Sequence, residues 1–337
     1  MSATRTIVRR SLLGLGVIVA VPVLFTGLNV AILLATDDRI PVSHWKSAES
    51  RSRFEATYAE TMRLLPEPSL TRDVMTDFGT VRAYRFDRPD ADEAYRAQDP
   101  LVLLPGHSAP VPMWLGNIPH YLPDRPVIAI DLLGQPGLSV PTRPVTTEAE
   151  QAAWLDQTLA GLGVERAHLV GVSFGGWTAV NYALHDPARV ATLSLLEPAF
   201  VFADPKPGFM LAAMLTAFPL LPAAYTDWFM AYTAGGAPID PDLPEAKLIG
   251  AGIDDYQVVE PTPRRFTDAE LLRIEAPMLV VFGGRSPLHD SAAALANARR
   301  LFPEAEARIK PEGSHAVHGE YADELDARIL AFARRHG

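Results

Sequence analysis

The stretch that most restricts the fold of this chain is a serine flanked by glycines between a strand-like and a helix-like run. Residues 171–175 read Gly-Val-Ser-Phe-Gly; an apolar run, residues 167–172, leads into Ser173, and a helix-like run, residues 177–185, follows it. This pattern predicts a sharp strand-to-helix turn with strained backbone dihedrals at the serine and no room for side chains at the glycines. Such a turn lifts the Ser173 hydroxyl clear of the sheet. It also places the Phe174 N–H at a helix N-terminus, where it can help bind an oxyanion.

The alternation of short apolar runs with helix-like segments predicts an α/β fold. Residues 71–86 read as two strands joined near residues 77–80, a hairpin. Beyond the hairpin the spacing is typical of a doubly wound, mostly parallel sheet. The expected strands are residues 101–104, 127–130, 167–172, 191–196, 278–282 and 307–310, and the expected helices are residues 148–162, 177–185, 291–301 and 321–335.

Residues 199–263 interrupt this alternation. They are rich in Phe, Met, Leu, Ala and Pro and contain no alternating strand pattern. We interpret them as a helical cap that lies over the carboxyl edge of the sheet, inserted into a core formed by residues 71–198 and 264–337. An apolar cap above a nucleophile would form the walls of an acyl- or alkyl-binding pocket.

The N-terminus carries a long uncharged apolar run. Leu12 to Ala35 is 24 residues without a charge, preceded by Arg5, Arg9 and Arg10. That length is enough to span a bilayer of ~30 Å, and the preceding arginines place the N-terminus in the cytoplasm and the rest outside. We therefore expect a membrane anchor at residues 1–36 and a stalk or linker helix within residues 37–70. The alternative is a cleaved signal peptide, which usually has a shorter apolar region, and the protein would then be secreted.

Composition excludes several classes of function. The net charge of −10 argues against nucleic acid as a partner. The 337 residues contain no cysteine, which excludes disulfides, thiolate catalysis and cysteine metal sites.

Three further segments carry a resemblance to a known family. Residues 103–107 (LLPGH) resemble an oxyanion loop, residues 131–139 (DLLGQPGLS) resemble a D-x-x-G-x-G-x-S loop with Pro136 inserted, and residues 313–315 (GSH) resemble the segment that holds a catalytic histidine. With the serine turn, these segments are similar to the α/β-hydrolase family over roughly residues 70–337. The resemblance implies that the backbone N–H of His107 is a second oxyanion donor, beside that of Phe174.

The resemblance makes His315 the expected catalytic base. A free serine hydroxyl is a poor nucleophile, and an imidazole that titrates near neutrality can take its proton and return it to the leaving group. His318, three residues further on, is the alternative. In the family the base directly follows the last strand and a glycine turn, which favours His315.

The third member of a catalytic triad stays open at this point. The family usually places an acid after the next-to-last strand, but here residues 282–290 read FGGRSPLHD, with Ser286 at the expected position. Glu197 ends the strand that follows the serine helix, where haloalkane dehalogenases and some other relatives take their acid. Asp290 lies four residues past the usual position, although it also suits the N-cap of the following helix. We favour Glu197 and keep Asp290 as the alternative.

These residues predict a serine hydrolase that cleaves carboxylic esters through an acyl-enzyme on Ser173. The apolar cap and the anchor favour a hydrophobic acyl chain, and the chemistry requires no cofactor and no metal. Carbon–carbon bond hydrolysis, thioester or amide hydrolysis and cofactor-free perhydrolysis use the same arrangement and remain alternatives. A catalytically silent binding protein on the same fold is the remaining reading, because a fold does not guarantee activity.

Overall fold

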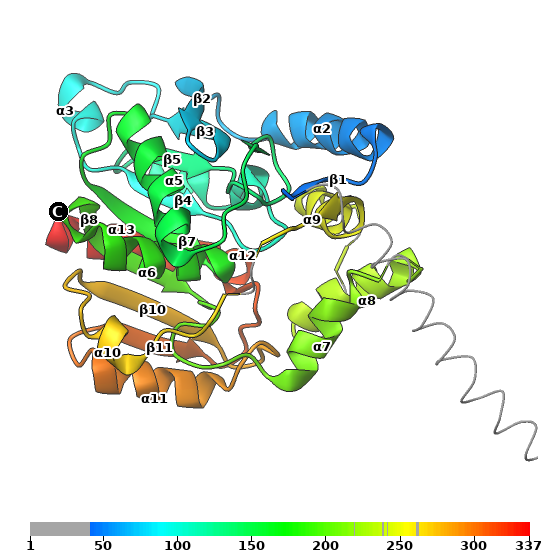
Figure 1. Ribbon diagram of the computed structural model, residues 1–337. Helices are drawn as coiled ribbons and strands as arrows, with labels where there is room; N and C mark the ends of the chain where they lie inside the picture. The colour runs from blue at the N-terminus through cyan, green and yellow to red at the C-terminus, as the bar shows by residue number, and fades with distance from the viewer. Residues whose placement is uncertain (1–40, 219, 238, 241, 261–262) are drawn as a thin grey trace, which may run out of the picture.

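The computed structural model describes residues 41–337, except residues 219, 238, 241 and 261–262. A mixed sheet lies between two layers of helices (Figure 1). Its strands are β2 (Leu70–Thr76), β3 (Gly79–Phe86), β4 (Leu101–Leu104), β5 (Val127–Ile130), β6 (Val140–Pro141), β7 (Ala167–Val172), β8 (Val190–Leu196), β10 (Met278–Gly283) and β11 (Glu306–Lys310).

The strand order is β11-β10-β8-β7-β4-β5-β3-β2, with β6 beside β3. From β5 to β11 the neighbouring strands are parallel, whereas β2 and β3 form an antiparallel hairpin that joins the sheet through β5. Every residue of β4, β5, β7, β8 and β10 is buried. This explains why these strands read as continuous apolar runs, because a parallel sheet is covered on both faces.

Each face of the sheet has its own core. Along β4, Val102 and Leu104 join one apolar cluster and Leu101 and Leu103 join the other, as the two-residue period of a strand requires. The first cluster includes buried residues of α5 (Glu148–Gly161), α6 (Phe174–His185) and α11 (Ser291–Leu301). The second includes buried residues of α2 (Ala48–Met62), α4 (Ile118–Tyr121) and α13 (Ala322–His336).

Short helices fill the connections. They are α3 (Glu93–Arg96), α10 (Asp268–Leu271) and α12 (Val317–Glu320), with single 3-10 turns at Val111–Trp114 and Pro187–Arg189. The hairpin, the six parallel strands and the four core helices match the residue ranges predicted from sequence, with ends shifted by up to three residues.

The helix expected as a stalk is part of the folded domain. In α2, Phe54 and Tyr58 are buried, and the Tyr58 hydroxyl donates a hydrogen bond of 3.0 Å to Asp131 Oδ2 in the core. Asp131 also accepts from the Val111 and Leu138 N–H groups at 2.8 Å. The mixed charges of α2 concealed this contact, because only a few residues of a surface helix need to be apolar to pack.

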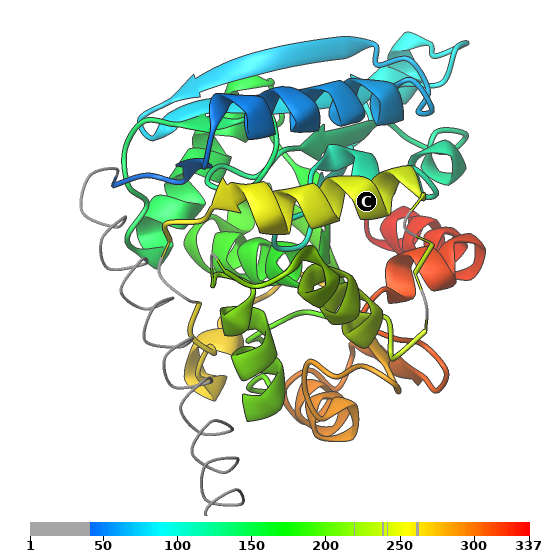
Figure 2. The ribbon, with the colours of Figure 1, turned by 90° about the vertical axis from the view of Figure 1, so that its right-hand side faces the viewer.

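The segment expected as a cap contains three helices, α7 (Pro207–Leu215), α8 (Ala223–Thr233) and α9 (Pro244–Asp255). It also contains the short strand β9 (Tyr256–Gln257), which pairs antiparallel with β1 (His44–Trp45). These helices lie to one side of the sheet and its flanking helices (Figure 1), and α9 runs beside α2 (Figure 2).

The membrane anchor expected at residues 1–36 lies outside the residues that the structure describes. Within residues 41–337, apart from the gaps given above, no helix combines the length and the apolar character that a membrane span needs.

Candidate active site

The Ser173 turn has the strained geometry that its glycines predict. Ser173 has φ 52° and ψ −114°, a conformation that L-residues rarely adopt. A Cβ at Gly171 would lie 2.4 Å from the Gly175 carbonyl oxygen, and a Cβ at Gly175 would lie 2.0 Å from that of Leu104. Neither position can hold a side chain, so the tight strand-to-helix turn depends on both glycines.

Glu197 meets His315 directly beside this turn. Glu197 follows β8 with φ 51°, and its side chain is fully buried. Its Oε2 lies 3.1 Å from His315 Nδ1, and its Oε1 accepts a hydrogen bond of 2.5 Å from the Gly283 N–H. The Ser173 N–H donates to the carbonyl of Leu196, the residue before Glu197, at 3.0 Å. The ends of the adjacent strands β7 and β8 thus place Ser173 beside Glu197, and the loop after β11 brings His315 to the same carboxylate.

Asp290, the other candidate acid, is not brought to His315. Its Oδ1 accepts hydrogen bonds of 3.0 Å from the N–H groups of Ala292 and Ala293, and the residue is exposed. It is the N-cap of α11, the structural role that its place before a helix suggested.

The loop after β10 supports Glu197 with two buried side chains. Ser286, at the position where the sequence lacked an acid, is buried and hydrogen-bonds the Glu197 carboxylate. His289 is also buried, with Nε2 3.8 Å from Glu197 Oε1. Burial opposes ionisation of Glu197, but the His315 and Ser286 hydrogen bonds, together with the charges of His315 and His289, hold its pKa below the ordinary value. Nothing in the sequence indicated these contacts beyond the position of the segment.

The cap reaches the imidazole from the other side. The backbone N–H of His315 donates a hydrogen bond of 3.2 Å to the Thr233 carbonyl of α8. The Phe209 ring of α7 stands edge-on to the His315 ring, with centroids 6.2 Å apart. His318 instead packs against Trp114, with ring centroids 5.7 Å apart. The contact with Glu197 therefore favours His315 over His318 as the base.

The loop expected to supply the second oxyanion donor lies against the nucleophile. A Cβ at Gly106 would lie 3.6 Å from Ser173 Cβ, and the rings of His107 and Phe174 meet edge-on with centroids 6.2 Å apart. Within the described part of the chain, neither the His107 nor the Phe174 N–H donates a hydrogen bond to another residue. Both groups are free to bind an oxyanion.

A buried relay holds this loop from behind. Ser108 has φ 59°, and its N–H donates to Gln135 Oε1 at 3.0 Å. Gln135 Nε2 donates in turn to Glu260 Oε2 at 3.3 Å, near the end of the cap segment. Gln135 therefore links the oxyanion loop to the end of the cap, a contact that sequence reasoning missed because it joins residues 125 positions apart.

Burial raises the pKa of Glu260 from 4.5 to about 8. The folded state then holds the proton more tightly than the unfolded chain, so stability falls as pH rises through the window between these two values. We expect Glu260→Gln, which stays neutral, to melt a few degrees above the wild type at pH 8.5. Near pH 4.5 the two proteins should melt at the same temperature. Thermal unfolding at both pH values measures this, and an equal difference at the two values would contradict it.

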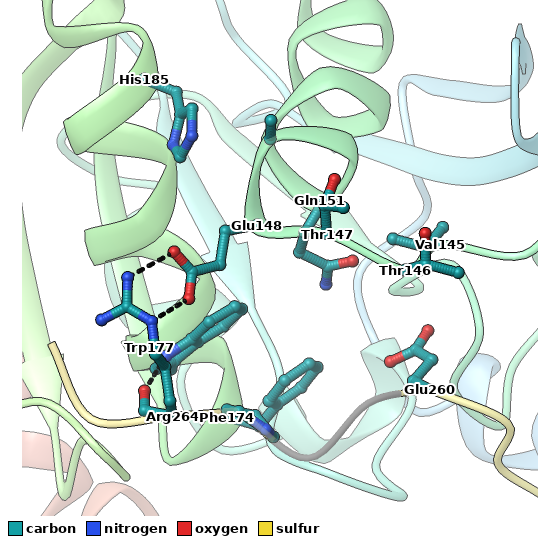
Figure 3. A pocket seen from close by; sticks show the side chains of 12 residues that line it. Val145, Thr146, Thr147, Glu148, Gln151, Phe174, Trp177, His185, Glu260 and Arg264 are labelled. Carbon is teal, nitrogen blue, oxygen red and sulfur yellow. Dashed lines mark hydrogen bonds and ion pairs between the residues drawn. The ribbon is translucent and has the colours of Figure 1, made fainter.

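A hollow of about 590 Å³ opens beside Phe174 (Figure 3). Trp177, stacked on Phe174 with centroids 5.7 Å apart, forms part of its wall, together with an Arg264–Glu148 ion pair of 2.7 Å. Neither Ser173 nor His315 lines this hollow. The hollow is therefore separate from the Ser173–His315 site, although Phe174, which carries an expected oxyanion donor, forms part of its wall.

Comparison with known proteins agrees with this architecture. A family model described as alpha/beta hydrolase fold matches residues 99–248. The carboxylesterase YbfK of Bacillus subtilis is 30% identical over 294 residues, covering 85% of this chain and 95% of its own. The crystal structure of that carboxylesterase superposes with a TM-score of 0.76 at 29% identity, over 85% of this chain and 98% of the other.

A second solved structure, the naproxen esterase of Bacillus subtilis, superposes with a TM-score of 0.76 at 26% identity, over 85% of this chain and 99% of the other. The fold and these relatives define the class of protein as a hydrolase. The chain belongs to the α/β-hydrolase fold family.

Proposed function

We propose that this protein is a serine hydrolase that cleaves carboxylic esters through an acyl-enzyme on Ser173. The observation that carries the proposal is the buried Glu197–His315 pair beside the strained serine turn. Two relatives that span most of the chain are carboxylesterases, which supports ester hydrolysis over the other chemistries of this arrangement. The alternative of a catalytically silent binding protein rested on Ser286, which stands where the family usually has an acid. The Glu197 carboxylate, which Ser286 hydrogen-bonds, supports an active enzyme instead.

The proposed reaction proceeds in two halves. His315 Nε2, the ring nitrogen not facing Glu197, accepts the Ser173 proton as Oγ bonds to the ester carbonyl carbon. The tetrahedral intermediate collapses, the carbon–oxygen bond to the alcohol breaks, and the imidazolium returns the proton to the leaving alcohol. Water then repeats the sequence on the acyl-enzyme and releases the carboxylic acid.

Each remaining group stabilises charge that develops during these steps. The His107 and Phe174 N–H groups would bind the carbonyl oxygen as it becomes an oxyanion. Glu197 accepts from His315 Nδ1, fixes the tautomer in which Nε2 is basic, and stabilises the imidazolium. The proposed mechanism calls for no metal and no cofactor.

A panel of substrates tests the proposal. We expect the purified full-length protein to hydrolyse p-nitrophenyl esters, and to prefer acyl chains longer than acetyl because Phe209 and the cap place apolar surface beside His315. The matched amide and thioester should turn over more slowly than the ester of the same acyl group. Faster cleavage of the amide or thioester, or no cleavage of any ester, would contradict the proposal.

Gln135 is expected to act as a positioning residue through the oxyanion loop. In Gln135→Ala the Ser108 N–H loses its buried acceptor, so the neighbouring His107 N–H is no longer held in place. We expect kcat to fall about tenfold, less than the loss of an oxyanion donor itself, with KM little changed. The inhibition constant of a trifluoromethyl ketone, which forms an oxyanion with Ser173, should rise by the same factor.

A second buried glutamine provides the control. Gln151 accepts a hydrogen bond of 2.9 Å from Trp154 Nε1 on α5, away from the oxyanion loop. Gln151→Ala should lower stability without changing kcat or ketone binding. Equal losses of kcat in both variants would assign Gln135 a merely structural role.

We further propose that the apolar run of residues 12–35 anchors the protein in the cell membrane with the catalytic domain outside. Its length and the arginines before it support this placement. Protease added to intact cells should then digest the domain. Digestion only after permeabilisation would contradict the orientation, and a mature protein that lacks the run would show cleavage and secretion.

A further inference from the structure

Two helices of the cap are apolar without being buried. The nine residues of α7 include no charged side chain, yet only Ala212 is buried, and in α8 only Thr226 is buried. Across residues 207–236 the sequence contains a single charged residue, Asp227. A helix that is apolar all round normally lies inside a protein or a membrane, so this composition requires a partner for the outer face of the cap.

The exposed apolar side chains gather on the same segment. Of the ten large apolar side chains that the described residues expose, half lie within residues 211–243, and the others are spread between residues 64 and 272. We call this set the cap face: Leu211 (54% exposed), Met214 (59%), Leu220 (41%), Trp228 (49%) and Leu243 (47%). In Figure 2, α7 and α8, which carry three of these residues, lie at the front of the molecule, toward the viewer.

The opposite side of α7 faces the catalytic imidazole. Phe209 contacts His315, and it also packs on Phe229 of α8 with ring centroids 5.9 Å apart. Tyr225 of α8 donates a hydrogen bond of 3.0 Å to the Ala212 carbonyl of α7. The helix pair is therefore a thin wall, with the active site on one side and the cap face on the other.

The N-terminal apolar run is tethered to this same cap. The described chain enters through β1, which pairs with β9 at the end of α9, and Ser43 Oγ accepts a hydrogen bond of 2.8 Å from the Val259 N–H. Only residues 36–40 separate Ala35, the last residue of the run, from Pro41. However they are arranged, they reach at most about 20 Å, so an anchor in the bilayer keeps the cap at the bilayer surface.

We infer that the cap face lies in the surface of the lipid bilayer, so that esters dissolved in the membrane reach Ser173 through the cap. The inference rests on the proposed ester hydrolysis and on the proposed anchor. Residues 207–236, which carry four of the five cap-face side chains, contain one charge, so this surface enters the headgroup region at little electrostatic cost, and tryptophan and tyrosine rings favour that depth. Trp228 supplies such a cluster, because it stacks on Tyr232 with ring centroids 5.3 Å apart and packs at a tilt against Tyr225 with centroids 5.2 Å apart.

Fluorescence of Trp228 tests the contact in the full-length protein. In phosphatidylcholine proteoliposomes, dibrominated phosphatidylcholine should quench a component of the emission that is missing in Trp228→Phe. The other four tryptophans are buried or half-buried, so the difference between the two proteins isolates Trp228. No difference in quenching between wild type and Trp228→Phe would overturn the inference, as would failure of the full chain to float with the vesicles.

Activity provides a second readout. In Leu211→Ser/Met214→Ser, kcat/KM for a long-chain ester embedded in vesicles should fall about tenfold, a loss of about 1.4 kcal/mol. Hydrolysis of a water-soluble acetyl ester should be unchanged. Leu272→Ser, an equally exposed leucine outside the cap, is the matched control and should keep both activities.

The outcomes separate this inference from the proposed function. Intact hydrolysis of the soluble ester with unquenched Trp228 would overturn membrane contact alone, whereas no hydrolysis of the soluble ester would count against ester hydrolysis itself. A dimer in detergent that Leu211→Ser dissociates would assign the cap face to a second copy of the chain, and would likewise overturn the inference.

Discussion

Replacing Glu197 by glutamine is expected to lower kcat for ester hydrolysis by about 10³–10⁴-fold, the loss typical of a triad carboxylate. Glutamine keeps the shape of the side chain and can still accept from the Gly283 N–H, but it carries no charge to stabilise the His315 imidazolium. Steady-state kinetics on a soluble ester measure the loss, and thermal unfolding confirms that the variant is folded.

Asp290→Asn is the matched control for this prediction. Both residues were candidates from the sequence, and asparagine caps a helix about as well as aspartate, so the α11 cap survives the change. We expect kcat within a fewfold of the wild type. A large loss in Asp290→Asn together with near-normal activity in Glu197→Gln would contradict the assignment of the acid.

Replacing Ser173 by alanine is expected to remove about 10⁶-fold of kcat, since the bond-forming atom itself is lost. Alanine at this position keeps the Cβ, so the strained turn is retained at no greater steric cost than serine. Binding of a long-chain substrate should persist, which equilibrium dialysis of the folded variant can measure. Substantial turnover by Ser173→Ala would mean that the reaction does not pass through an acyl-enzyme on this residue.

The serine turn could be predicted from sequence because its requirements are local. A side chain at Gly171 or Gly175 would clash with backbone atoms of the turn or of the neighbouring strand β4. The strand and helix patterns on either side of the turn are also strong. His315 was expected as the base for a similar reason, because it lies two residues after Gly313 in the loop that follows the last strand. In both cases a few consecutive residues carry the whole signal.

The acid could not be decided from sequence because the choice depends on strands far apart in the chain. Glu197 reaches His315 only because β8 lies between β7 and β10 in the sheet. Asp290 had a visible competing role as a helix cap, and that local signal was the better guide to its position.

Contacts between distant parts of the domain could not be predicted from the sequence. The burial of α2 depends on Tyr58 reaching Asp131, and the oxyanion loop depends on Gln135 reaching Ser108 and Glu260. A glutamine or a tyrosine in a single sequence carries no mark of such a partner, because the partner is set by the packing of the finished fold.

Reaction of the full-length protein with a fluorophosphonate probe tests the central claim most directly. We expect one covalent adduct per chain, located on Ser173 by peptide mass spectrometry, with labelling slowed in Glu197→Gln and unchanged in Asp290→Asn. A folded wild-type protein that forms no adduct, or forms it on another residue, would contradict the claim that Ser173, His315 and Glu197 make up a hydrolytic site.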